Sequence, residues 1–153
     1  EQIGYKPEMI LSGRKVNEMM TIIFLEKIIN FLRLKKKRVK GTKMLIIGGT
    51  FKEDCPDVRN SKIIDFLIQA LDKGFDLNIY DPIADFSNIN KSLKKYIINE
   101  LPLNQEYDVL VIGVAHSLFK EFLIKNYLKI LNKNGFVFDI KGILKKSNNI
   151  IRP

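Results

Sequence analysis

Residues 44–62 read MLIIGGTFKEDCPDVRNSK and join an apolar run to an amphipathic one through a charged loop. MLIIGG at 44–49 is typical of a buried strand, and SKIIDFLIQALDKG at 61–74 has the apolar spacing of a helix that ends at Gly74. In many α/β proteins a loop at this place binds phosphate. This loop instead carries a dense set of reactive or charged side chains, namely Lys52, Glu53, Asp54, Cys55, Asp57 and Arg59.

Short β-rich runs and helical patterns alternate along the rest of the chain from residue 42. We expect a second helix at 119–135, ending at Gly135, and further strands at 75–82, 96–99, 107–115 and 136–140. Residues 83–95 are expected to form a short helix or a loop, and the tail at 145–153 carries little signal. This alternation predicts an α/β fold with a Rossmann-like, parallel, doubly wound sheet.

A long helical pattern precedes the sheet and runs from Pro7 to about Arg38, with Gly41 as the expected stop. A helix of that length would extend about 45 Å. Its apolar residues cover more than one stripe, and a second apolar face implies contact with another domain or with a second subunit. We therefore divide the chain into a helix at 1–41 and an α/β domain at 42–153.

The formal net charge of +9 is concentrated in the helix segment, where residues 1–42 hold ten Lys or Arg against four Glu. The run KKKRVK at 35–40 has two interpretations. It can be a solvated helix end, whose cations complement the helix dipole, or a surface for nucleic acid or an anionic membrane. The second interpretation gives the alternative function, a standalone basic module that binds nucleic acid through residues 33–40.

Composition also narrows the class of protein. No apolar run approaches the roughly 18 residues of a membrane span. The single Cys suits a reducing cytoplasm, and one Cys with one distant His predicts no metal site. The chain begins with Glu1, which suggests a fragment of a longer protein.

An anion site is expected beyond the carboxyl ends of the strands, where ligands of doubly wound sheets bind. The loops at 48–61, 81–88, 115–119 and 139–144 converge there and carry Lys52, Arg59, His116 and Lys141. Cationic side chains and helix N-termini suit phosphates. The first loop lacks the G-x-G-x-x-G spacing, so we do not predict a self-sufficient NAD fold, although Asp81 stands where a ribose-binding acid usually lies.

Other residues of these loops allow more than one role. Cys55 is interpreted as a loop residue without chemistry, because Glu53, Asp54 and Asp57 oppose the cations that would activate a thiol. His116 is either a ligand-binding tip or a capping residue. Asp57 and Ser61 flank the start of the helix, where short polar side chains cap free N–H groups.

The loop GGTFKEDCPDVRNSK at 48–62, followed by YDP at 80–82, resembles the C-terminal domain of the UDP-glucose/GDP-mannose dehydrogenase family. The sequence of this loop is similar to that of the UDP-N-acetylhexosamine 6-dehydrogenase branch of the family. GYKPEMILSGRKVNEMM at 4–20 resembles the linker into that branch's central helix, and VAHSLF at 114–119 and FVFDIKGIL at 136–144 resemble its later loops. The resemblance extends from Gly4 to about Leu144.

The resemblance implies a two-step, NAD-dependent oxidation of a sugar C6 alcohol to a carboxylate, used for surface polysaccharide synthesis. It also implies that the nucleophilic cysteine, the other catalytic residues and the NAD fold lie upstream of Glu1, so no catalytic residue is expected in this chain. The expected partners are a UDP-sugar and a second copy bound through the long helix, without nucleic acid, membrane or metal.

Roles follow from the resemblance residue by residue. Phe51 and Lys52 match positions that line the UDP-sugar site, and Lys141 falls near a cation-bearing stretch of that site. Arg59 matches an arginine that reaches the NAD cofactor of the other domain. Arg14 matches an arginine that the helix lends to the neighbouring subunit.

Overall fold

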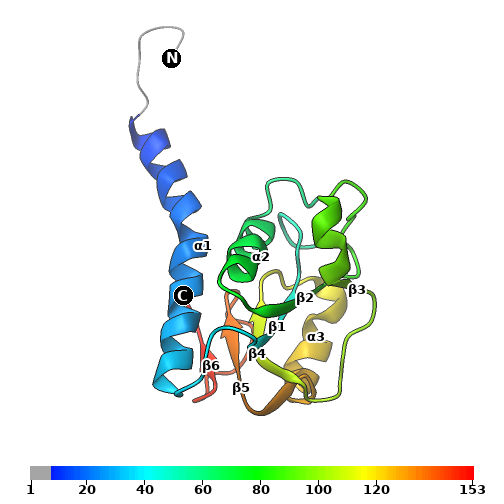
Figure 1. Ribbon diagram of the computed structural model, residues 1–153. Coiled ribbons are helices and arrows are strands. Elements are labelled where there is room, and N and C mark those ends of the chain that lie inside the picture. Colours follow the sequence, from blue (N-terminus) through cyan, green and yellow to red (C-terminus); the bar gives the residue numbers. More distant parts are fainter. Residues whose placement is uncertain (1–7) are drawn as a thin grey trace, which may run out of the picture.

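The computed structural model describes residues 8–153, in which six parallel strands form one sheet (Figure 1). The strand order is β3-β2-β1-β4-β5-β6, so the chain winds outward from the centre in both directions. The strands are β1 (Lys43–Ile47), β2 (Asp76–Tyr80), β3 (Ile97–Ile98), β4 (Tyr107–Ile112), β5 (Leu131–Asp139) and β6 (Ile150–Ile151). This arrangement confirms the predicted doubly wound sheet.

Helices cover both faces of the sheet, because its central strands are apolar on both sides. In β1, Met44 and Ile46 join the core beneath α1 (Glu8–Leu34) and α2 (Lys62–Asp72). Leu45 and Ile47 point to the other core, which α3 (Ser117–Asn126) covers. Continuous apolar strands of this kind are typical of parallel sheets that are buried on both faces.

The long helix α1 packs beside α2 with its C-terminal half, where Ile28 and Leu32 are fully buried. Its N-terminal half extends past α2 in Figure 1 and leaves Ile10 and Val16 more than half exposed. The described part of the chain therefore does not cover the apolar surface of this half.

The helix ends at Leu34, short of the predicted Arg38 and well before Gly41. Lys36 adopts a left-handed conformation with φ of 55°. The N–H groups of Lys36 and Lys37 donate to the carbonyl oxygens of Arg33 and Leu32, which is a Schellman ending. The prediction missed this ending because it normally uses glycine.

The basic run that follows is partly used within the fold. The Nζ of Lys37 lies 2.5 Å from Oδ1 of Asp108. The Nζ of Lys35 lies 5.2 Å from the ring centroid of Phe31. These contacts favour the structural interpretation of residues 35–40 over the nucleic-acid one.

The second half of the predicted helix at 119–135 is wrong. The helix α3 ends at Asn126, the 3-10 turn η2 (Tyr127–Lys129) follows, and residues 131–135 already belong to β5. Leu131 pairs with Tyr107 and Phe136 with Val109, so four residues bulge out between these pairs. Gly135 serves this bulge, because a Cβ there would lie 2.9 Å from the carbonyl oxygen of Tyr107.

Smaller elements complete the sheet. Residues 83–95 contain a loop and the start of the 3-10 helix η1 (Lys91–Tyr96), as the prediction allowed. The tail, which carried little signal, adds β6 as an edge strand.

No helix within residues 8–153 combines the length and the apolar character needed to cross a membrane. The same residues bring no three potential His, Cys or carboxylate ligands together for a metal ion.

Gly48 is the position where β1 turns into the charged loop, and it has a φ of 82°. A Cβ at Gly48 would lie 2.3 Å from the carbonyl oxygen of Val114, which is backbone and cannot move aside. The loop after β1 and the loop after β4 thus touch through a glycine, which sets their spacing at the carboxyl edge of the sheet.

We predict that Gly48→Ala strongly lowers the free energy of unfolding, by about 2 kcal/mol or more, because it combines a steric clash with an unfavourable φ. The matched control is Gly13→Ala, since Gly13 lies in α1 with nothing within 4 Å of a new Cβ. The free energy of unfolding of that variant should rise by up to about 1 kcal/mol, because alanine favours the helix more than glycine does. Urea denaturation of both variants measures the difference, and equal effects would contradict the packing role of Gly48.

Candidate functional site

A cavity of about 300 Å³ lies at the carboxyl edge of the sheet, between α1 and the loops after β1, β4 and β5. The helix contributes Asn17, Met20 and Phe24, and the loops contribute Phe51 and Lys141. The wall is mostly apolar with a few polar groups, which is typical of small-molecule sites. This cavity is the candidate ligand site.

The structure brings two of the predicted substrate residues together and separates the other predicted residues, including the cofactor residue Arg59, from them. Phe51, whose side chain is 62% exposed, and Lys141 both line the candidate site. Lys52 is exposed on the same loop but does not line it. Arg59 lines a separate cavity of about 260 Å³ beside Asp85 and Asn88. Arg14 lies in α1, and its side chain is outside the part that the structure describes.

The three predicted cations at the carboxyl edge of the sheet differ in their ion pairs. Arg59 donates to both carboxylate oxygens of Asp57, from Nε at 3.0 Å and from Nη2 at 2.9 Å. The Arg59 side chain, through these hydrogen bonds, lowers the pKa of Asp57 to about 2, and the same contact raises the pKa of Arg59. The Nζ of Lys141 lies 3.5 Å from Oε1 of Glu53. Within residues 8–153, Lys52 has no carboxylate oxygen within 4.0 Å and presents its full charge to solvent.

Three carboxylates at this edge occupy backbone N–H groups that could otherwise bind phosphate. Asp54 accepts from the N–H and the hydroxyl of Ser117 at the start of α3, and these bonds lower its pKa. Asp81 accepts from the N–H groups of Ile83 and Ala84. Asp139 accepts from those of Gly142, Ile143 and Leu144. An incoming anion therefore depends on side-chain cations such as Lys52 and Lys141.

The same contacts explain why the first loop does not suit a dinucleotide. The N–H of Gly49 donates to Oδ2 of Asp81 at 2.7 Å, and the Asp81 side chain is fully buried. Asp81 is thus unavailable to a ribose hydroxyl. Gly48 is needed for contact with Val114 rather than for the approach of a pyrophosphate.

His116 stands at the N-cap position of α3, as one of the two interpretations of the sequence allowed, but its side chain has a different task. It is completely buried, and it occupies the position before α3 without making a side-chain cap. Its ring instead bonds to Asp81, Thr50 and the backbone of Asp54. Ser61 does cap α2, since its hydroxyl accepts from the N–H of Ile63, whereas Asp57 accepts from Arg59. Cys55 is half-buried and has its thiol free.

The contribution of α1 to the candidate site was missed from the sequence. Met20 and Phe24 belong to the apolar pattern of the helix, which predicts core or interface residues equally well. Asn17 is a polar residue beside that pattern and was its only available signal. Periodicity alone cannot tell which end of a long helix faces a ligand.

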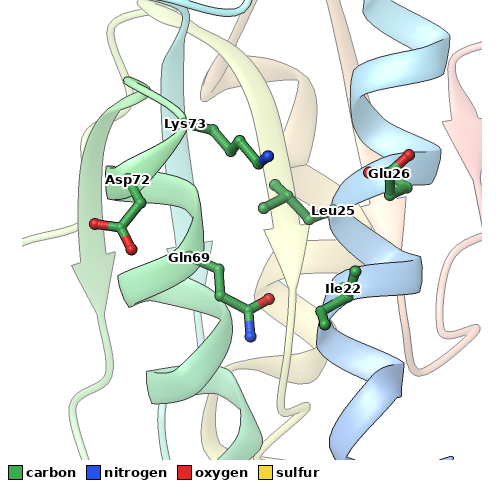
Figure 2. A pocket seen from close by; sticks show the side chains of 6 residues that line it. All are labelled: Ile22, Leu25, Glu26, Gln69, Asp72 and Lys73. Carbon is green, nitrogen blue, oxygen red and sulfur yellow. The ribbon is translucent and has the colours of Figure 1, made fainter.

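A second cavity, of about 360 Å³, lies between α1 and α2 (Figure 2). Gln69 and Lys73 reach from α2 toward Ile22 and Leu25 of α1 in this view. Gln69 donates to the hydroxyl of Thr21 at 2.9 Å, while its buried Oε1 has no hydrogen-bond partner among residues 8–153. None of the loops at the carboxyl edge reaches this cavity, and it brings no set of reactive groups together.

Comparison with known proteins places these features in a family. Residues 45–146 match the model of the UDP binding domain of the UDP-glucose/GDP-mannose dehydrogenase family. The chain is 29% identical to UDP-N-acetyl-D-glucosamine 6-dehydrogenase of Pseudomonas aeruginosa, over 99% of this chain and 36% of that protein. It is 31% identical to the enzyme of the same name from Salmonella typhi, over 98% of this chain and 35% of that one.

A solved structure shows the same fold. The NDP-N-acetyl-D-galactosaminuronic acid dehydrogenase of Methanosarcina mazei superposes with a TM-score of 0.73 at 19% identity, over 98% of this chain and 32% of that chain. The chain thus spans about a third of the length of the proteins that it matches. The match over most of the sheet, with its charged loop and its carboxyl-edge cavity, shows that this chain belongs to the UDP-glucose/GDP-mannose dehydrogenase family and contains its UDP binding domain.

Proposed function

We propose that this chain is the UDP-binding part of an NAD-dependent 6-dehydrogenase that acts on a UDP-N-acetylhexosamine or on UDP-glucose. The carboxyl-edge cavity, with Phe51 and Lys141 in its wall, carries the proposal. The relatives of this chain are named as UDP-sugar dehydrogenases, which supports a UDP-sugar as the substrate. The complete enzyme would oxidise the sugar C6 alcohol to a carboxylate in the cytoplasm, for polysaccharide synthesis.

The residues of this chain bind and orient the nucleotide rather than perform the oxidation. The exposed ring of Phe51 offers a flat apolar surface to the nucleoside or the sugar. Lys141 and Lys52 supply positive charge for the diphosphate, where backbone N–H groups are already occupied.

In the complete enzyme, bound NAD would supply the hydride acceptor for the oxidation. The chain's own contribution toward it is Arg59, whose guanidinium is held by Asp57 and stays largely exposed. One exposed arginine beside a shallow cavity fits a contact to a cofactor that is held elsewhere, and it does not make a cofactor site on its own. The rest of the NAD site is assigned to the other domain of the family.

We predict that isothermal calorimetry shows UDP binding to this chain more tightly than NAD. The candidate site has cations and an apolar wall, whereas Asp81 and the loop glycines are unavailable to a dinucleotide. The chain alone should produce no NADH from a UDP-sugar. Tighter binding of NAD, or catalytic turnover by the pure chain, would contradict the assignment.

Lys52 and Arg59 lie on one loop but are proposed to face different anions. In the full-length enzyme, Lys52→Ala should lower kcat/KM for the UDP-sugar. The expected loss corresponds to about 1.5–3 kcal/mol, the range for a hydrogen bond to a charged group. Arg59→Ala should instead weaken use of NAD. Lys133→Ala, which removes an exposed charge at the opposite end of β5, is the control for general electrostatic loss. Equal effects of both loop variants on one ligand would contradict the separation of roles.

We also propose that the chain forms a homodimer through residues 8–34 of α1. The exposed apolar side chains of its N-terminal half support a second copy as the occupant, because surfaces of this kind seldom stay in water. Two copies of one helix packed symmetrically make an isologous contact. The assignment of Arg14 to the neighbouring site depends on this dimer.

We predict that Ile23→Glu dissociates the dimer while the α/β domain stays folded, because it places a charge on the exposed apolar surface of α1. Ile68→Glu on α2 is a matched control, since Ile23 and Ile68 are 43% and 42% exposed. Sedimentation velocity at micromolar concentration compares the two variants with the unmodified chain. A monomeric unmodified chain would exclude the dimer.

A further inference from the structure

His116 is a completely buried polar residue at the carboxyl edge, and the proposed function gives it no role. It follows β4, and its ring is fully buried, with the ring of Phe119 at a centroid distance of 5.2 Å. Both ring nitrogens are bonded to other loops. His116 thus connects the loops after β1, β2 and β4.

The hydrogen bonds define a single protonation state of the ring. Nδ1 accepts the backbone N–H of Asp54 at 2.8 Å, so Nδ1 carries no proton. The proton of the neutral ring is then on Nε2, which lies 3.0 Å from Oδ2 of Asp81 and 3.2 Å from the hydroxyl oxygen of Thr50. That hydroxyl donates to the carbonyl of Lys52, so it accepts from the ring.

The bond at Nδ1 holds the segment that carries Phe51 and Lys52. Asp54 has a φ of 55°, a conformation that costs energy for a residue other than glycine. The N–H of Phe51 donates to the carbonyl of Asp57 at 2.8 Å and closes the loop on its other side. The exposed Phe51 and Lys52 therefore sit on a turn whose interior is bonded to one imidazole nitrogen.

We propose that His116 is the positioning residue of this ligand loop, acting through Nδ1, and that its two nitrogens have separable tasks. Nδ1 sets the shape of residues 50–54, and hence the affinity for the nucleotide. Nε2 donates a hydrogen bond to the buried carboxylate of Asp81, and hence stabilises the fold. The inference rests on the proposed binding of UDP and adds a residue that does not touch the ligand.

Two amide substitutions separate the tasks. In His116→Asn, the amide oxygen can take the place of Nδ1 and accept from Asp54, while the donor to Asp81 is lost. In His116→Gln, the longer side chain can still donate to Asp81, while the acceptor for Asp54 is lost. We expect His116→Asn to lower the Tm and to keep the Kd for UDP within about twofold.

His116→Gln should have the opposite profile, a Tm close to that of the unmodified chain and a Kd raised about tenfold, since an unmade hydrogen bond releases the loop. Calorimetry with UDP and thermal denaturation measure the two quantities for each variant. A merely structural histidine would give a loss of affinity that follows the loss of Tm in both variants. That result, or an unchanged Kd in His116→Gln, would overturn the proposal.

The unmodified chain supplies a test that does not depend on how the variants fold. Nitrogen-15 NMR of the histidine should show the proton on Nε2, and UDP should slow hydrogen exchange at the amide of Asp54. A proton on Nδ1 would overturn the role of His116 alone. Failure of the unmodified chain to bind UDP would overturn the proposed function, whatever the state of the histidine.

Discussion

The carboxylate of Asp81 is the interaction on which the carboxyl edge of the sheet depends. Its side chain is fully buried, and an unpaired charge there would be strongly unfavourable. The N–H groups of Gly49, Ile83 and Ala84, together with the ring of His116, surround it. Because these groups come from the loops after β1, β2 and β4, one carboxylate draws three strand ends together. The shape of the ligand loop is therefore a consequence of satisfying this charge.

This use of Asp81 also separates the domain from a dinucleotide fold with the same sheet order. In a dinucleotide site, the acid after the second strand and the glycines after the first are left free for the ligand. Here both are used internally, and Asp54 and Asp139 fill further N–H groups of the edge. An anion at this edge would then be bound by long cationic side chains, as proposed for Lys52 and Lys141. A site of this kind takes its charge from flexible residues and its shape from the apolar wall of α1.

The sequence predicted the strands well where a single pattern decided them. Residues 44–49 and 107–115 are apolar apart from Asp108 and the phenol of Tyr107, and they supply most of the central strands β1 and β4. It failed at residues 131–135, where helical spacing continues but pairing with Tyr107 and Val109 gives a strand with a bulge. It failed again at the end of α1, where Lys36 takes a glycine-like conformation. In both places contacts between distant residues outweigh the local preference.

The candidate site was predictable as a set of loops but not as a set of contacts. Loop positions follow from strand order, so the sequence alone places Phe51 and Lys141 at the carboxyl edge of the sheet. The role of His116 could not, since a histidine after a strand has the same local sequence whether it faces solvent or Asp81. Likewise, only the structure shows which side chains of the loop after β1 line the candidate site and which lie elsewhere. Arg59 turns toward Asp57 and a cavity of its own, while Phe51 turns toward α1.

The long helix links the site to the proposed assembly. Asn17, Met20 and Phe24 line the ligand cavity, while Val16 and Ile23, only one residue away from two of them, are exposed. Neighbouring residues of a helix point about 100° apart, so one helix can present one face to a ligand and another to a partner. A displacement of α1 would alter both surfaces together. In the proposed assembly the helix would be a wall of the candidate site as well as an interface, which gives a physical reason for the site and the helix to occur as one unit.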